Sequence, residues 1–292
     1  MVIRHMVDVL NSWWFNLIGY LMCIVVFSQY YKLAVRNAKR DGAATILLQL
    51  IAGVSILLLA PFLSFKLPSD PKIYLLLIAA SIFYALNDRM QTTARKNLQV
   101  SLYVILDRLS AIFLIVFGFT IFKNPFVIEK VIGAALILLG NFVVLYKRGK
   151  FELNKYVILS ILATLTFSIA VSIDIGISKN FNLPFYIMLT LVIPAIMISL
   201  VEKINPKEIL SQYSPIDKKY YLITGFSWGL LIFFLLRAYQ FGQVTVVASL
   251  AATSVLINVL VAYIFLKEQD HKLKKIIAAL VTILGVYLTV LK

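Results

Sequence analysis

The chain has 292 residues, of which 61% are hydrophobic and only 14% are charged, and its mean hydropathy is +0.93. A soluble domain is roughly 45–50% apolar and about 25% charged, so this composition excludes a water-soluble globular protein and places the chain in a lipid bilayer. The net charge of +15 would suit nucleic acid, but the Lys and Arg residues form short clusters between long apolar runs. Loops that flank membrane helices have this pattern, and we therefore expect no nucleic-acid partner.

Ten apolar runs reach the length of about 20 residues that a membrane-spanning helix needs. In chain order they cover residues 13–33, 43–65, 73–94, 98–121, 128–147, 155–178, 183–202, 220–240, 244–266 and 273–291. The connections between them are short, so the sequence predicts an all-α membrane protein with ten transmembrane helices. The first run lacks a small-residue cleavage site, so we expect no cleaved signal peptide. Cys23 is the only cysteine, which excludes an intrachain disulfide.

The fourth and fifth runs repeat in the ninth and tenth. An offset of 144 positions lays Gln99 on Gln243 and Ser110 on Ser254, and one extra loop residue then brings Gly140 onto Gly285. The offset is close to half the chain, which predicts two five-helix units at residues 1–150 and 151–292. Because five is odd, the second unit must enter the bilayer with the opposite orientation. This is the inverted repeat of many secondary transporters, whose binding site lies between the halves near the midplane.

Charge in the loops predicts the orientation of the chain. The loops after odd-numbered runs hold most of the Lys and Arg residues, and positive loops prefer the cytoplasm. The count therefore favours cytoplasmic odd-numbered loops and both chain ends outside.

Three acids and three arginines fall inside the predicted spans: Asp88, Asp107, Asp174, Arg89, Arg108 and Arg237. Charges at this depth are costly and usually face the interior of the bundle, where they mark a functional site. Asp107 and Arg108 are near the centre of the fourth span. Because successive residues point about 100° apart on a helix, each needs a partner on another helix. We expect Arg89 or Arg237 beside Asp107, and Asp88 or Asp174 beside Arg108.

Polar residues follow helical spacing on the same spans. Ser81, Tyr84, Asp88, Gln91 and Arg95 form one stripe on the third span. Tyr103, Asp107 and Ser110 form another on the fourth. Further polar groups lie on the first, eighth and ninth spans. The predicted substrate-binding residues are therefore Asp107, Arg108, Asp88, Arg89, Arg237, Tyr84, Tyr103, Gln29, Asp174 and Asn258. The alternative for any one of them is a tie between helices without contact to a substrate.

One short pattern resembles an enzyme motif. Gly225, Ser227 and Gly229 match G-x-S-x-G, but they lie in a span, and the histidines His5 and His271 fall in the terminus and a loop. Small residues four apart more simply predict close helix packing. The sequence shows no metal-ligand spacing and no phosphate-binding loop, so we expect no catalytic residues, no metal and no cofactor.

The repeats and the end of each half resemble the EamA-type transporters of the drug/metabolite transporter superfamily. The resemblance covers nearly the whole chain and is most specific in residues 236–239, 265–268 and 284–287, with a looser copy at 122–124 and 133–140. The chain departs from the family where Asn124 replaces the glutamate found at Glu268. It also lacks a proline in the fourth and ninth helices, and the fourth carries Asp107 and Arg108 instead.

The resemblance implies a central cavity lined by the first, third, fourth, sixth, eighth and ninth helices. It also implies a bacterial cytoplasmic (inner) membrane and cytoplasmic chain ends, which conflicts with the charge count. We expect an alternating-access transporter of a small polar or zwitterionic metabolite, such as an amino acid, with a phosphorylated metabolite as the alternative. Asp107 and Arg108 would bind its charges, and Tyr84, Tyr103 and Trp228 would stack on its apolar part. Proton coupling and exchange stay open, as do a monomer and a homodimer. A flippase for a lipid-linked intermediate and a membrane-embedded enzyme are the competing classes.

Overall fold

A computed structural model describes residues 11–98, 103, 106–107, 109–145, 154–213, 217–265 and 272–290. All regular elements in these ranges are helical. The longer helices are α2 (Trp13–Val35), α3 (Asp41–Leu57), α4 (Pro71–Asn97), α6 (Leu109–Thr120), α7 (Ile128–Leu145), α8 (Lys155–Ile177), α9 (Leu183–Glu202), α11 (Lys218–Phe241), α13 (Ser254–Phe265) and α14 (Lys272–Val290). The shorter ones are η1 (Ala60–Phe62), η2 (Ser178–Asn180), α10 (Pro206–Ser211) and α12 (Val244–Ala251).

Six of these helices are long and apolar enough to cross a membrane: α2, α3 extended through η1, α4, α8 extended through η2, α9 and α11. Residues 109–120, 244–258 and 277–290 form shorter apolar helices. Large hydrophobic side chains such as Met22, Leu75 and Leu200 are exposed on the outer surface of the bundle. The chain is therefore an all-α protein whose apolar helices fit a multi-pass membrane protein. Each of the ten predicted ranges overlaps a helix, but the ninth is divided between α12 and α13.

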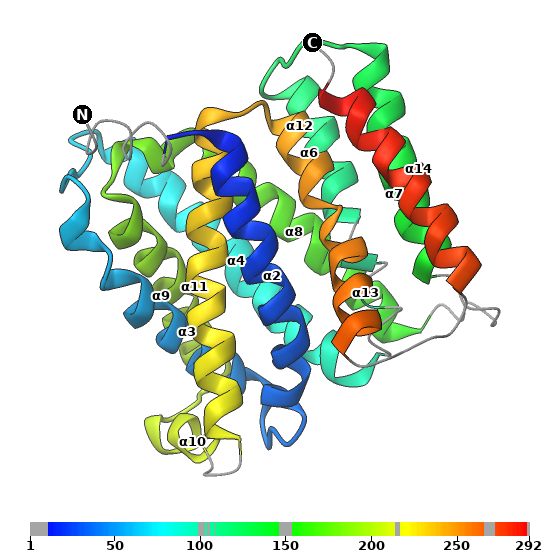
Figure 1. Ribbon diagram of the computed structural model, residues 1–292. Coiled ribbons are helices and arrows are strands. Elements are labelled where there is room, and N and C mark those ends of the chain that lie inside the picture. Colours follow the sequence, from blue (N-terminus) through cyan, green and yellow to red (C-terminus); the bar gives the residue numbers. More distant parts are fainter. Residues whose placement is uncertain are drawn as a thin grey trace.

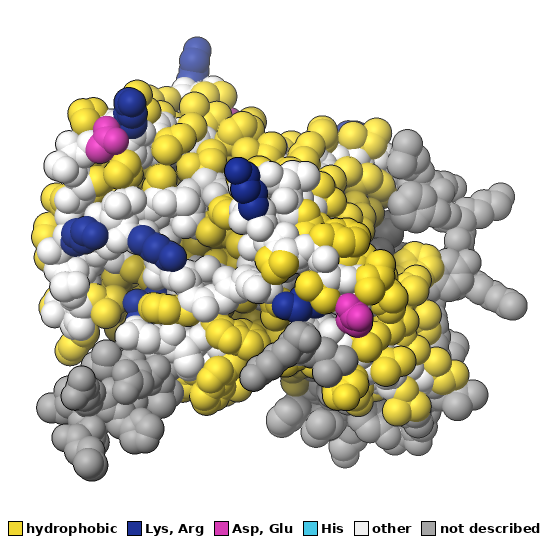
Figure 2. Space-filling model, turned by 90° about the horizontal axis from the view of Figure 1, so that it is seen from above, with side chains coloured by type: hydrophobic (Ala, Val, Ile, Leu, Met, Phe, Trp, Pro, Cys, Tyr) yellow, Lys and Arg dark blue, Asp and Glu magenta, His cyan; other side chains and the backbone are white. Residues whose placement is uncertain are grey.

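Neighbouring helices come mostly from distant parts of the chain. The closest packed pairs are α2 with α11, α4 with α8, α3 with α9, and α7 with α14. Helix α6 packs on α8 and α12. The start of α2 and the end of α14 lie at one end of the bundle, and α10 lies at the other (Figure 1). Seen from the end with the start of α2, Lys and Arg side chains stand among polar atoms while hydrophobic side chains cover the flanks (Figure 2).

Helices α7 and α14 approach so closely that their backbones nearly touch. A Cβ added to Gly133 would lie 2.6 Å from the carbonyl oxygen of Gly285, and a Cβ added to Gly285 would lie 2.7 Å from that of Gly133. Two turns further on, a Cβ on Gly140 would meet the carbonyl oxygen of Ala278 at 3.0 Å. Small residues allow this approach, which replaces side-chain packing by backbone contact.

Polar side chains fix the ends of several helices. Asp70 caps α4 by accepting from the backbone N–H of Lys72, and Asn154 caps α8 in the same way. Asn182 caps α9 and also donates to the carbonyl oxygens of Ala60, Leu63 and Ser64. The buried Asn182 amide therefore holds the segment after α3 against the start of α9.

Candidate functional site

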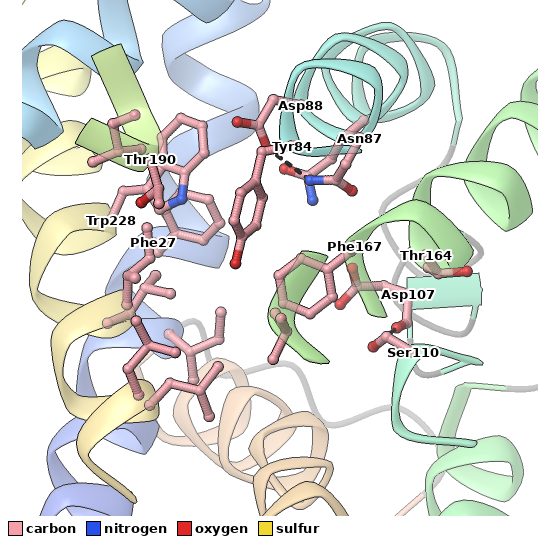
Figure 3. Close-up of a pocket in the computed structure, with 18 of the residues that line it drawn as sticks. Phe27, Tyr84, Asn87, Asp88, Asp107, Ser110, Thr164, Phe167, Thr190 and Trp228 are labelled. Atoms are coloured by element: carbon pink, nitrogen blue, oxygen red, sulfur yellow. Dashed lines mark hydrogen bonds between the residues drawn. The ribbon is translucent and has the colours of Figure 1, made fainter. Parts of the chain in front are cut away.

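A cavity of about 100 Å³ lies at the middle of the bundle (Figure 3). It is lined by α2, α4, α6, α8, α9 and α11, together with Asp107 just before α6. Tyr20, Ile24 and Phe27 come from near the middle of α2, and Thr164, Phe167 and Val171 from near the middle of α8. The family resemblance implied that the ninth of the ten predicted spans, residues 244–266, lines the cavity; this span corresponds to α12 and α13. Among the described residues, α12 and α13 contribute none of the lining, and α9 supplies Thr190 and Leu191 instead.

The α4 wall of the cavity is polar. Tyr84, Asn87, Asp88, Gln91 and Arg95 all line it, because steps of three and four residues keep side chains on one face of a helix. The predicted stripe on the third span therefore faces the cavity, except for the buried Ser81, whose hydroxyl bonds the carbonyl oxygen of Leu77.

The facing wall is apolar and aromatic. It is formed by Phe27 on α2 with Trp228, Leu231, Ile232 and Leu235 on α11. The ring centroids of Phe27 and Trp228 are 5.7 Å apart, within the range of favourable aromatic pairs. A molecule in the cavity would thus meet charged and amide groups on one side and hydrocarbon on the other.

Asp88 is a buried carboxylate held by neutral donors. Its side chain is 3% exposed; Oδ2 accepts from Gln49 Nε2 at 2.7 Å, and Oδ1 accepts from Asn87 Nδ2 at 2.7 Å. A buried carboxyl is costly unless it is hydrogen-bonded, and these two amides satisfy it in part. Each carboxylate oxygen can accept more than one bond, which leaves acceptor capacity for a ligand in the cavity.

Asp174 lies behind the cavity wall rather than in it. It is fully buried, and it accepts from the hydroxyl of Tyr84 at 2.6 Å and from that of Tyr186 at 2.5 Å. The Tyr84 side chain lines the cavity and is labelled beside the open space in Figure 3. Asp174 therefore orients a cavity side chain without lining the cavity itself.

Asp107 lies on the other side of the cavity, near Ser110 and Thr164 (Figure 3). The Tyr103 hydroxyl lies 3.4 Å from its Oδ1, and the Ser110 hydroxyl donates to its main-chain carbonyl oxygen at 2.6 Å. Tyr103 is buried beneath Arg95 and is not among the lining residues. Arg108, the predicted binding residue next to Asp107 in the sequence, lies outside the described residues.

Several predicted site residues lie away from the central cavity. Arg89 does not face the cavity; it forms an ion pair with Glu202 at the end of α9 and donates to Thr93 at 2.5 Å. The expectation of Arg89 beside Asp107 is therefore wrong, because its side chain leaves α4 on the face toward α9. Gln29 donates to Asn258 at 3.3 Å, and these two join α2 to α13 away from the cavity lining.

Arg237 lines a second pocket of about 400 Å³ at the end of the bundle where α2 begins. It donates to Asn11 at 2.6 Å, and its guanidinium carbon is 5.0 Å from the ring centre of Phe241. Lys66 and Lys179 line the same pocket, and no acidic side chain is among its described lining residues. Arg237 is thus part of a basic pocket and not of the central cavity.

The list of predicted binding residues omitted several residues of the central site, including four polar ones with clear roles. Arg95 and Asn87 line the cavity, and Gln49 and Tyr186 hold the two buried carboxylates. Arg95 belongs to the predicted stripe on the third span. Because it is next to Lys96 at the end of that span, the sequence did not distinguish it from the charged residues of the following loop. The only signal for Gln49 was a lone amide within an apolar run.

The G-x-S-x-G stretch is a packing feature. A Cβ on Gly229 would lie 2.8 Å from the carbonyl oxygen of Ala52, and one on Gly225 would lie 2.5 Å from the side chain of Ile51. The Ser227 hydroxyl donates to the carbonyl oxygen of Ile223 one turn earlier. These residues let α11 approach α3, and no group of three metal-ligating side chains occurs within the described part of the chain.

Comparison with known proteins gives the fold but no family. No family model matches the chain, and no curated protein matches it. A solved crystal structure of another protein is similar over 94% of this chain and 96% of its own, with a TM-score of 0.75 and 12% sequence identity. At this identity the similarity shows that nearly the whole helical arrangement is shared, and nothing about activity.

Proposed function

We propose that this protein is a secondary transporter that moves a small polar or zwitterionic metabolite across a membrane by alternating access. In this proposal ten helices cross the bilayer as two inverted five-helix halves, residues 1–150 and 151–292, of the EamA type. The membrane is the cytoplasmic membrane of a bacterium. The proposed site is the central cavity.

The observation that carries the proposal is that equivalent positions of the two halves line one cavity. At the offset of 144 found in the sequence, six lining residues of the first half fall on six of the second: Tyr20 on Thr164, Phe27 on Val171, Tyr84 on Trp228, Asn87 on Leu231, Asp88 on Ile232 and Gln91 on Leu235. Helix α4 runs away from the end where α2 begins, and α11 runs toward it (Figure 1). Equivalent residues on oppositely directed helices are what an inverted repeat around a central site requires.

Helix packing supports the same relation. In the repeat, α2 corresponds to α8 and α4 corresponds to α11. Exchanging the two halves therefore turns the pair of α2 with α11 into the pair of α8 with α4, and both pairs are among the closest in the bundle. The pairs α3 with α9 and α7 with α14 map onto themselves. At the offset of 145, the contact of Gly133 with Gly285 maps onto that of Ala278 with Gly140, and both contacts occur.

The chemistry of the lining supports a small cargo with both charge signs. Asp88 and Asp107 offer carboxylates for an ammonium group, and Arg95 offers a guanidinium for an anion. Pro194 has no N–H, so the main-chain carbonyl of the lining residue Thr190 lacks the donor that a regular helix would supply. The cavity is smaller than the roughly 300 Å³ of a typical drug-sized site, which favours a metabolite of amino-acid size.

Counterflow in liposomes tests the proposal. The full chain is reconstituted, the lumen is loaded with unlabelled amino acids, and uptake of labelled amino acids is followed. We expect saturable uptake that falls at least about tenfold in Asp88→Asn and Asp107→Asn, because each loses a charged partner of the cargo. Glu129→Gln, at an exposed position on α7, makes the same carboxylate-to-amide change away from the cavity and is expected to keep full uptake. Absence of uptake above empty liposomes would contradict transport of this class.

A second candidate function has one observation in its favour. The basic pocket of Lys66, Lys179 and Arg237 could hold the phosphate of a lipid-linked intermediate, as a flippase requires. Binding of a polyprenyl phosphate that is lost in the Lys66→Gln and Lys179→Gln double variant, without amino-acid counterflow, would favour the flippase over the metabolite transporter.

A further inference from the structure

Arg95 is held in the cavity wall by three aromatic rings. Its guanidinium carbon lies 4.2 Å from the ring centre of Tyr103, 4.7 Å from that of Tyr31 and 5.3 Å from that of Phe27. These rings come from α2 and from the segment before α6, whereas Arg95 is on the last turns of α4. A cation over an aromatic face is attracted by the ring quadrupole, and the three rings therefore hold the guanidinium in one place.

The charge of Arg95 has no counter-ion within ion-pair distance among the described residues. None of the ion pairs among the described residues includes Arg95, although Arg89 and Lys96 on the same helix both pair with carboxylates. Its Nε is buried and has no hydrogen-bond partner among the described residues. A buried donor that is left unsatisfied destabilises the folded protein, so a site that keeps one needs a reason.

A guanidinium can use its face and its edge at the same time. Rings stack on the planar face, while the N–H donors point outward in the plane and match the two oxygens of a carboxylate or phosphate. Arg95 lines the cavity, so an acceptor for these donors has room there. The aromatic cage thus fixes a positive charge in the wall of the cavity.

The rest of the lining selects among anions. Asp88 and Asp107 share the cavity with Arg95, and a dianionic phosphate would be repelled by them more strongly than a carboxylate. The wall opposite α4 carries Leu231, Ile232 and Leu235 and would receive a hydrocarbon group.

We infer that Arg95, held by Phe27, Tyr31 and Tyr103, binds the carboxylate of an amphipathic cargo whose apolar group packs on α11. The inference rests on the proposed function and deepens it, because it makes the carboxylate the obligatory part of the cargo.

Binding to the purified full chain tests this inference with four probes. L-leucine carries both charges, 4-methylpentanoate lacks the amine, 3-methylbutylamine lacks the carboxylate, and inorganic phosphate lacks the hydrocarbon. Fluorescence of Trp228 in the cavity wall, checked against a Trp228→Phe variant, reports binding. We expect leucine and 4-methylpentanoate to bind at least about tenfold more tightly than 3-methylbutylamine. Tighter binding of the amine, equal binding of all probes, binding of phosphate alone, or no binding of either carboxylate would overturn the inference.

Two substitutions at Arg95 separate charge from geometry. Arg95→Gln removes the charge and is expected to weaken carboxylate binding by about 10- to 100-fold while leaving the amine unaffected. Arg95→Lys keeps the charge but loses the paired N–H donors of the guanidinium, and an intermediate loss of carboxylate affinity is expected. Arg36→Gln, which removes a 45% exposed arginine outside the cavity, is the matched control and should bind like the wild type. If Arg95→Gln does not fold, the lysine variant and the wild-type probe preference still decide the question.

Counterflow distinguishes this inference from the proposed function. Carboxylate-dependent binding that requires Arg95, without flux in liposomes, would leave the binding site standing and reject the transporter. Flux of amines as fast as that of carboxylates, unchanged in Arg95→Gln, would keep a transporter and reject the carboxylate site.

Discussion

Tyr84 and Tyr186 donate to the same carboxylate, but only one of them faces the cavity. Both hydroxyls bond Asp174, from α4 and from α9 respectively. Tyr186 is completely buried, while Tyr84 is partly exposed to the cavity that it lines. A matched pair of substitutions can therefore separate the support of the fold from the contact with a ligand.

Tyr84→Phe and Tyr186→Phe each remove one hydroxyl from Asp174, and each is expected to lower the free energy of unfolding by about 1–3 kcal/mol. Only Tyr84→Phe is expected also to weaken cargo binding severalfold, because its hydroxyl and ring orientation belong to the cavity wall. Thermal unfolding and ligand titration of both variants measure the two effects. Equal loss of binding in both variants would place Asp174 and its partners in one functional unit instead.

Glu208, on α10 outside the membrane-spanning helices, gives a pH-dependent contact. The hydrogen bond from Arg40 at 2.5 Å holds the pKa of the Glu208 carboxyl below its ordinary value of 4.5. A carboxyl whose pKa is lowered by folding stabilises the folded state above its unfolded pKa, and this contribution is lost as the pH falls through the folded value.

We therefore expect the melting temperature of the wild type to exceed that of Glu208→Gln at pH 7, with the difference shrinking as the pH drops below about 4.5. Melting curves of the two proteins in one detergent, recorded from pH 7 down to pH 3, measure it. A difference that stays constant over this range would show that the contact does not depend on ionisation.

At the scale of the elements, the glycines distinguish close helix approach from open surface. Gly285 on α14 touches the backbone of α7, whereas a Cβ added to Gly176 on α8 would meet nothing within 4 Å. Both residues lie inside helices. The same substitution should therefore have opposite effects at the two positions.

Gly285→Ala is expected to destabilise the protein by about 1–3 kcal/mol, because the added methyl group forces α7 and α14 apart. Gly176→Ala is expected to be neutral or to stabilise by up to about 1 kcal/mol, since alanine is the better helix former. Thermal unfolding of the two variants against the wild type tests both. A stable Gly285→Ala protein would mean that the two helices can separate without cost.

An ion-pair network joins four elements at the end of the bundle near α10. Glu202 at the end of α9 receives Arg89 from α4 and Arg40 from the start of α3, and Arg40 also pairs with Glu208. Lys96 and Asp41 add a pair at 2.8 Å. This explains why Arg89 was a misleading candidate: a charge inside one helix can pair with an acid at the end of a neighbouring helix.

At the scale of the whole molecule, the two ends of the bundle carry different loops. Ser64 lies beyond η1 at the end where α2 begins, and Ser211 ends α10 at the opposite end; both are exposed. The excess of Lys and Arg in the loops after odd-numbered spans predicts that the α10 end faces the cytoplasm.

In a Cys23→Ser background, Ser64→Cys is expected to react with a membrane-impermeant maleimide on intact cells. Ser211→Cys is expected to react only after the membrane is opened. Gel shift of the labelled protein measures this. The reverse pattern would support cytoplasmic chain ends, as the family resemblance implies, and labelling of both on intact cells would contradict opposite membrane sides for the two ends.

The sequence by itself determined that the chain is apolar and helical enough for a membrane, where most of the helices lie, and that α4 has a polar face, because composition and helical periodicity are local properties. Only the tertiary structure decided which charged groups meet. Arg89 finds Glu202, 113 residues away, and Tyr84 finds Asp174, 90 residues away. Arg95 is placed among rings from α2 and the fourth predicted span. Such partners depend on how helices pack and rotate against one another, and the spacing of residues along one helix carries no information about the side chain that a neighbouring helix will present.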